Sequence, residues 1–215
     1  MVTARSSRSR FRWAVLVAAG LAGALAGALL AAHGSVGLGG AAHGAANTLV
    51  PRPGSYSRLV PQRPPSAWRS ATIASGGATV FYPPNWKPIP GDSGTVSFAL
   101  RGRGGSYEGY LNVTPQQGAE RLAGWSSFRL ARNRDEGDRH VHAIAEAEGL
   151  RFAGSRGSCV IDDYNSRVGS HPYRELACII AGPHFTNVFI GATLRADWPR
   201  LGPVVQRAAS SLIER

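Results

Sequence analysis

The stretch 158–181, SCVIDDYNSRVGSHPYRELACIIA, has the pattern of two β-strands joined by a turn. Residues 158–168 and 173–181 are rich in β-branched and aromatic side chains, and Gly169 lies between them. If Cys159 lies opposite Cys178, the same register sets Asp162 opposite Glu175. Five apolar side chains then share one side of the sheet, as a buried face requires: Cys159, Ile161, Leu176, Cys178 and Ile180. The sequence therefore predicts an antiparallel hairpin with one buried face.

The same register brings the two cysteines of the chain together. Opposed residues at a narrow antiparallel pair have Cα atoms about 4.5 Å apart, which is within reach of a disulfide. We therefore predict a Cys159–Cys178 disulfide, and the alternative is a pair of buried free thiols.

Around this hairpin the pattern alternates between strands and helices. Strands are predicted at 71–74, 79–82, 95–101, 107–114, 141–148 and 185–194, and helices at 116–134 and from 198 or 199 to 214. In the first helix we expect Leu122, Trp125, Phe128 and Arg132 to share a face. Strands in runs with short turns form antiparallel sheets, so this order predicts an α+β fold with helices covering an antiparallel sheet.

The N-terminal third differs from this domain. Residues 1–12 are basic, residues 13–32 form an uncharged apolar run, and residues 33–69 are rich in Gly, Ala, Pro and Arg. A helix of about 20 residues spans the hydrocarbon core, and the basic start places the N-terminus in the cytoplasm. We expect a single-pass membrane anchor, a linker over 33–69 and an extracytoplasmic domain over 70–215. The alternative is a signal peptide cleaved near Ala32-His33-Gly34, which would release a secreted protein.

Charge is concentrated in the same third. Residues 1–69 hold eight arginines and no acidic residue, although the whole chain has a formal net charge of +11. The predicted domain is therefore nearly balanced, whereas a nucleic-acid-binding domain carries its basic residues on the folded part. We expect the membrane as a partner, through the N-terminal helix, and no nucleic acid.

The tetrapeptide Gly91-Asp92-Ser93-Gly94 is similar to the nucleophile loop of trypsin-like proteases. A serine nucleophile needs a histidine base and an orienting acid. Of the histidines, only His33 and His43 precede Ser93, and nothing in the spacing brings a later one to it. All four residues favour turns, so we interpret this stretch as a turn between strands. A hydrolase using Ser93 or a histidine remains the alternative function.

Other candidate sites are weaker. His140 and His142 point to one side of a strand and would start a metal site, but no further ligand is apparent, and we predict neither a metal nor a cofactor. Four aromatic side chains would line a ligand pocket between sheet and helices if they are not simply core: Tyr82, Trp86, Trp125 and Trp198.

The stretch FYPPNW, 81–86, resembles the opening strand of PsbP-like domains, with Tyr82, Pro83 and Trp86 at the matching positions. The segment ending GAERLAGW at Trp125 and the closing VVQRAASSLIER, 204–215, are also similar to that family, which includes exported actinobacterial lipoproteins of the LpqN type. This resemblance implies an αβα sandwich over about 70–215 and a non-catalytic binding or assembly role. The lipid-bearing cysteine of the lipoprotein members has no counterpart near the apolar run.

These observations favour a non-enzymatic extracytoplasmic domain that binds a protein or a small apolar molecule.

Overall fold

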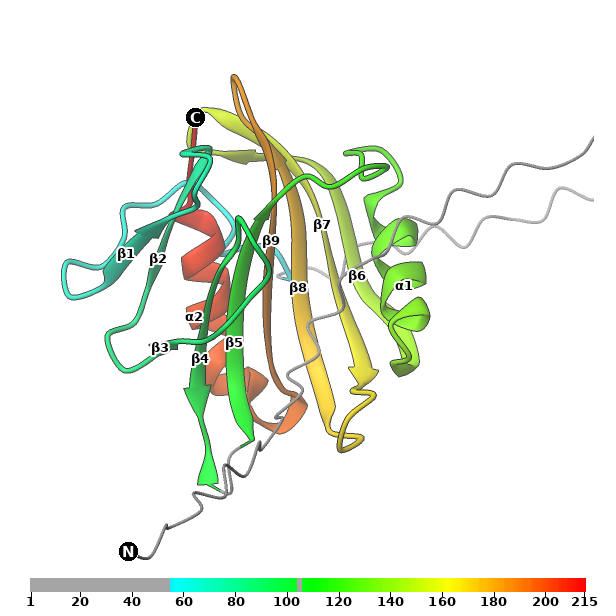
Figure 1. The fold of residues 1–215 in the computed structure, drawn as a ribbon. Coiled ribbons are helices and arrows are strands. Elements are labelled where there is room, and N and C mark those ends of the chain that lie inside the picture. The colour runs from blue at the N-terminus through cyan, green and yellow to red at the C-terminus, as the bar shows by residue number, and fades with distance from the viewer. Residues whose placement is uncertain (1–54, 104–105) are drawn as a thin grey trace, which may run out of the picture.

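The computed structural model describes residues 55–103 and 106–215, and Figure 1 shows their arrangement. The predicted basic segment 1–12, the apolar run 13–32 and most of the predicted linker lie outside the described residues. No helix within the described ranges is long and apolar enough to cross a membrane.

A seven-stranded sheet forms the centre of the domain (Figure 1). Its strands follow the order β3-β4-β5-β9-β8-β7-β6, and every neighbouring pair is antiparallel. The strands are β3 (Lys87–Pro88), β4 (Val96–Arg101), β5 (Tyr107–Pro115), β6 (Arg139–Phe152), β7 (Ser155–Asn165), β8 (Pro172–Ala181) and β9 (Thr186–Leu194).

The two helices lie on opposite faces of this sheet (Figure 1). Helix α1 (Trp125–Asp135) covers β6, β7 and the adjoining part of β8, while α2 (Trp198–Ser210), which follows the 3-10 turn η2 (Arg195–Asp197), packs on β8 and β9. A small sheet of β1 (Arg69–Thr72), β2 (Ala78–Tyr82) and β10 (Ile213–Glu214) lies beside α2. The predicted α+β fold, an antiparallel sheet covered by helices, is confirmed.

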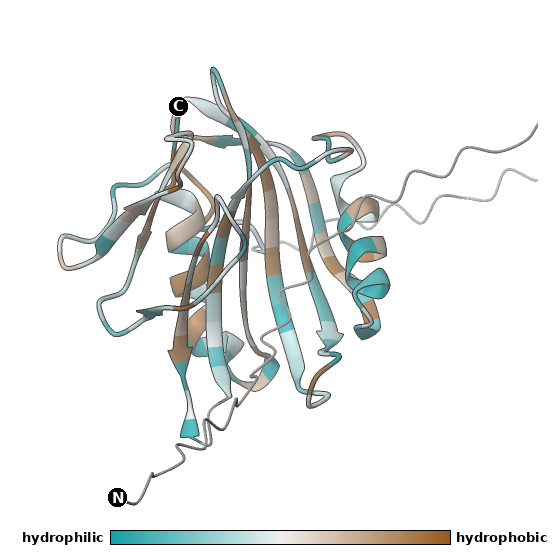
Figure 2. Cartoon of the chain, in the orientation of Figure 1, coloured by the Kyte–Doolittle hydropathy of each residue, from teal (hydrophilic) through white to brown (hydrophobic). Residues whose placement is uncertain are grey.

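The hairpin of β7 and β8 has the predicted register, with Cys159 opposite Cys178 and Asp162 opposite Glu175. The two sulfur atoms form a disulfide with an S–S distance of 2.07 Å. The five apolar residues of the predicted buried face all belong to the core beneath α2. Figure 2 shows β8 changing from hydrophilic near its start to hydrophobic towards its end.

Gly191 on β9 lets α2 approach the sheet closely. A Cβ atom at this position would lie 2.5 Å from Cγ1 of Val205 on α2, so a larger residue would push the helix outward. The two layers therefore meet at a residue without a side chain.

The first helix begins later than predicted, at Trp125 rather than at 116. Gly118 and Gly124 have φ of 94° and 72°, a left-handed conformation that breaks the helix, so residues 116–124 form a loop. The predicted face is only partly confirmed: Trp125 is buried and Phe128 packs against the same cluster, but the buried residues of α1 are Trp125, Arg129 and Asn133. Two of these three are polar, which an apolar periodicity does not detect.

The chain also ends differently from the prediction. Helix α2 stops at Ser210, and Ile213 and Glu214 pair with Thr79 and Ala78 of β2. Of the apolar residues that suggested a helix to 214, Val205 and Ala208 lie in α2, whereas Ile213 lies in β10. Leu212, between the two elements, is buried in the core.

The predicted linker 33–69 ends earlier than expected, because its described part packs on the domain. Leu59 is buried in the core, and the Tyr56 hydroxyl donates a hydrogen bond of 2.8 Å to the carbonyl oxygen of Ala145. The backbone amide of Gln62 donates to the carbonyl oxygen of Ser210 at the end of α2. Proline-rich composition suggested a solvated segment, but these few contacts are enough to hold it.

Candidate ligand-binding groove

A cavity of about 670 Å³ lies on the sheet face that carries α1. Helix α1 covers β6 to β8, and the cavity extends from this helix over β9, β5 and β4 towards the turn between β3 and β4. We call this hollow the α1 groove. Its volume is within the range of 300–1,000 Å³ that is usual for small-molecule sites.

The floor of the α1 groove combines apolar and amide side chains. In the sheet register Ile190 of β9 lies opposite Asn112 of β5, which in turn lies opposite Ser97 of β4. The Asn112 side-chain amide donates a hydrogen bond of 2.9 Å to the Ser97 hydroxyl. Val188 and Thr114, the next opposed pair along β9 and β5, continue the floor.

Four tyrosines line one part of the groove: Tyr107, Tyr110, Tyr164 and Tyr173. The hydroxyls of Tyr110 and Tyr164 are 3.0 Å apart and share a hydrogen bond. The Tyr173 ring stacks on Tyr164, and its hydroxyl donates to the carbonyl oxygen of Tyr107. Burial raises the pKa of Tyr110 and of Tyr164 well above the usual value, so both hydroxyls keep their protons.

A charged pair lies beside these tyrosines, beneath α1. Arg129 of α1 donates to Glu175 of β8 through Nε at 2.6 Å and Nη2 at 2.9 Å. Glu175 is fully buried, and Arg129 is 8% exposed and lines the groove. Burial alone would lower the pKa of Arg129, but the Glu175 carboxylate raises it, so the guanidinium remains charged.

Asp162 lies opposite Glu175 on the same face and is also fully buried. It accepts a hydrogen bond of 2.9 Å from the Asn133 side chain. Burial raises the pKa of Asp162 well above its usual value, and the Glu175 carboxylate raises it further. Two adjacent buried carboxyls cannot both ionise easily, so we assign a proton to Asp162.

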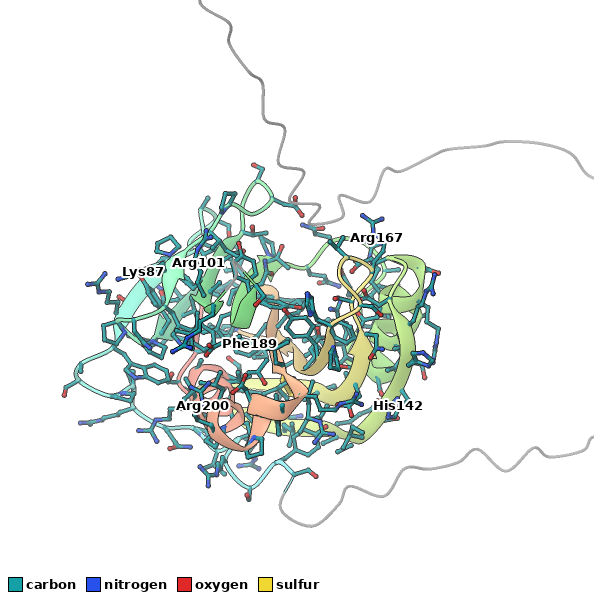
Figure 3. All side chains as sticks on the ribbon, turned by 90° about the horizontal axis from the view of Figure 1, so that it is seen from below. Lys87, Arg101, His142, Arg167, Phe189 and Arg200 are labelled. Atoms are coloured by element: carbon teal, nitrogen blue, oxygen red, sulfur yellow. A yellow bond between two sulfur atoms is a disulfide. The ribbon has the colours of Figure 1, made fainter. Side chains whose placement is uncertain are left out.

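The rim of the groove is more polar. Arg132 of α1 pairs with Glu136 at 2.8 Å, and the Asp138 carboxylate accepts a hydrogen bond from the backbone amide of Arg167. Asp92 and Glu120 contribute further carboxylates to the lining. Figure 3 shows Arg167 at the edge of the molecule near α1, far from Phe189 in the interior.

Of the four aromatics predicted to line a pocket, one lines the α1 groove. Trp125 stacks on Phe128 and donates through Nε1 to the carbonyl oxygen of Ala177. Tyr82 and Trp86 are buried in the core on the α2 side, and Trp198 packs against that core. Tyr82 stacks on Phe98 with ring centroids 3.7 Å apart.

Ser93 lies in an exposed turn between β3 and β4. Gly94 has φ of 83°, and the backbone amide and hydroxyl of Thr95 both donate to the Asp92 carbonyl oxygen, which closes the turn. Among residues 55–103 and 106–215, no histidine hydrogen-bonds to Ser93.

The two histidines considered for a metal site, His140 and His142, are both exposed near the start of β6. Their strand is irregular there, since His140 has φ of 56° and the register on β7 shifts between Arg139 and His142. In the described part of the chain no three His, Cys, Asp or Glu side chains gather as metal ligands do.

Sequence reasoning missed Arg129, Glu175, Asp162 and the tyrosines as site residues. A signal for part of this set was present, because the hairpin register already placed Asp162 opposite Glu175 and Tyr164 opposite Tyr173, on the face away from the cysteines. Two buried acids in register need a cation. Which arginine supplies that cation depends on the face that α1 buries, and the predicted face contained Arg132 rather than Arg129.

No protein-family model matches the sequence, and no curated protein matches it either. Solved structures do resemble the fold. Cyanobacterial PsbP (CyanoP) from Synechocystis is 18% identical, with a TM-score of 0.50 over 70% of this chain and 94% of that one. The Ran-binding protein Mog1p of Saccharomyces cerevisiae is 9% identical, with a TM-score of 0.49 over 68% of this chain and 95% of that one.

LpqN, which is involved in cell envelope biogenesis of Mycobacterium tuberculosis, is 9% identical, with a TM-score of 0.41 over 67% of this chain and 88% of that one. Identities this low bear on the fold alone. The domain has a PsbP-like fold, and the resemblance based on Tyr82, Pro83 and Trp86 is confirmed at that level.

Proposed function

We propose that this protein is a non-catalytic binding domain that holds a small amphipathic molecule in the α1 groove. The observation that carries the proposal is the groove itself, about 670 Å³ lined by aromatic rings, hydroxyls and the arginine of a buried ion pair. Apolar walls with a few placed polar groups are typical of small-molecule sites.

The proposal includes a location outside the cytoplasm. It is supported by the Cys159–Cys178 disulfide, because disulfides persist in oxidising compartments. It is also supported by the basic segment 1–12 followed by the uncharged run 13–32. We propose that this run tethers the domain to the membrane through the segment that follows it, or that its cleavage releases the protein. Intact mass of the protein from membranes and from culture supernatant distinguishes the two.

Blocking the groove tests the binding function. Thr114→Trp places a large ring in the groove, whereas Thr72→Trp places the same ring on exposed β1, outside it. We expect 2-naphthamide, a probe with an apolar body and an uncharged polar end, to bind full-length protein in lipid nanodiscs. Ligand-observed NMR should detect this binding in the wild type and in Thr72→Trp but not in Thr114→Trp. Equal binding by all three proteins would contradict the proposal.

A further inference from the structure

We infer that Arg129 is the anchor for a carboxylate group of the ligand, so the α1 groove selects molecules in which a carboxylate adjoins an apolar or aromatic body. This inference rests on the proposed function and adds the chemical class of the ligand to it.

The guanidinium of Arg129 has one edge occupied and one edge free. Nε and Nη2 both donate to the two oxygens of Glu175, which fixes the plane of the group. Within residues 55–103 and 106–215, Nη1 makes no hydrogen bond. Arg129 lines the groove, and its uncommitted donors are assigned to a ligand bound there. An arginine held by a carboxylate on one edge can offer the other edge to an anion at little further cost in side-chain entropy.

The neighbouring hydroxyls complete the donor set. In the Tyr110–Tyr164 pair one hydroxyl donates to the other, at 3.0 Å, so the accepting hydroxyl keeps a hydrogen for a further partner. Burial keeps both tyrosines protonated and therefore able to donate. A ligand carboxylate beside Arg129 thus meets a charged donor and a neutral donor together.

The charges around the groove favour this one position for a carboxylate. Asp162 lies next to Glu175, and burial raises its pKa, so it adds little negative charge beneath Arg129. Arg132 is already paired with Glu136. Elsewhere the lining includes Asp92, Glu120 and Asp138, which would repel an anion, and the remaining arginine, Arg167, is exposed on the β7–β8 turn.

A matched pair of probes tests the inference without any mutation. 2-Naphthoate and 2-naphthamide share the same ring system, but only the first carries a carboxylate. A charge-assisted hydrogen bond in a partly buried site predicts that full-length protein in nanodiscs binds naphthoate about tenfold more tightly. Only the ligand-observed NMR signal that is lost in Thr114→Trp counts as groove binding.

Variants then assign this preference to a residue. The double variant Arg129→Gln/Glu175→Gln removes both charges together and should reduce the preference for naphthoate to less than about twofold. Arg151→Gln removes an exposed arginine of β6 that does not line the groove, and it should leave the preference unchanged. If the double variant does not fold, Arg129→Lys keeps the charge over Glu175 but lacks the fork, and should weaken naphthoate binding severalfold without affecting naphthamide.

The outcomes separate the two proposals. Equal binding of both probes, lost in Thr114→Trp, would overturn the carboxylate inference and leave the binding function standing. A preference that survives in Arg129→Gln/Glu175→Gln and in Arg129→Lys, or that disappears in Arg151→Gln, would overturn the role of Arg129. Both proposals fail if neither naphthoate nor naphthamide gives a binding signal that is lost in Thr114→Trp.

Discussion

Arg129 and Glu175 place two opposite charges in a largely buried position at the edge of the α1 groove. Their bidentate contact satisfies both oxygens of a fully buried carboxylate. Such a pair adds little net stability compared with apolar residues of similar shape, but removing one partner leaves a buried charge uncompensated. The pair is therefore costly to break, and its presence beside a groove agrees with a role in binding.

Arg129→Met should lower the free energy of unfolding by about 3–5 kcal/mol, because Glu175 then stays buried without a cation. Arg129→Met/Glu175→Leu should recover most of this loss. Urea unfolding followed by circular dichroism measures both. Arg200→Met is the control: Arg200 pairs with Glu108 and Asp197, but its side chain is 57% exposed, and we expect a change below about 1 kcal/mol. A similar loss in both arginine variants would contradict the argument from burial.

At the scale of elements, the short strand β10 closes the domain against β2. Its residue Glu214 is buried and accepts a hydrogen bond from the Asn187 side chain. Burial raises the pKa of Glu214 from 4.5 to about 8 despite this bond. The proton is therefore held by the folded protein at pH values where the unfolded chain releases it.

Stability should consequently fall as pH rises from about 5 to 8, because the unfolded state binds fewer protons than the folded state in this window. Above the folded pKa of about 8 this contribution no longer changes. Glu214→Gln cannot ionise, so it should flatten this part of the pH dependence. Its free energy of unfolding at pH 8 should exceed that of the wild type by on the order of 2 kcal/mol. Urea unfolding at pH 5 and pH 8 measures the difference, with exposed Glu148→Gln as control. An unchanged slope in Glu214→Gln would show that Glu214 is ionised in the folded state.

At the scale of the whole molecule, the segment before β1 is part of the domain. Leu59 is 3% exposed within the core, Tyr56 bonds to the carbonyl oxygen of Ala145 on β6, and Arg207 of α2 donates to the carbonyl oxygen of Arg63. The segment thus contacts both α2 and β6, the edge strand of the large sheet. A domain boundary at residue 70, as composition would suggest, would leave these contacts out.

Leu59→Ala should destabilise the protein by about 2–4 kcal/mol, as expected for removing a buried leucine side chain. The neighbouring Val60 is 53% exposed, so Val60→Ala should change stability by less than about 0.5 kcal/mol. Thermal and urea unfolding of the two variants compare a buried and an exposed position one residue apart. Equal effects would mean that the segment is not packed in solution.

The register of the β7–β8 hairpin was predictable to the residue, although β7 runs from Ser155 to Asn165 rather than over 158–168, whereas the buried face of helix α1 was not predictable. A strand has a side-chain period of two, so the alternation in 158–181 leaves one register that buries the apolar face and joins the cysteines. In α1 the buried face includes Arg129 and Asn133, and their burial depends on Glu175 and Asp162 from other strands. A local pattern contains no information about such partners.

The sequence by itself determined the antiparallel α+β class, the β7–β8 register and the disulfide, because each follows from alternation and pairing along short stretches of chain. Only the tertiary structure decided where the groove lies, that Trp125 lines it while Tyr82 and Trp86 do not, and that Arg129 belongs beside four tyrosines. These residues come from elements far apart in the chain, and they meet because the curved sheet and α1 bury them together. Burial is a property of the packed layers, so it appears only once the layers are assembled.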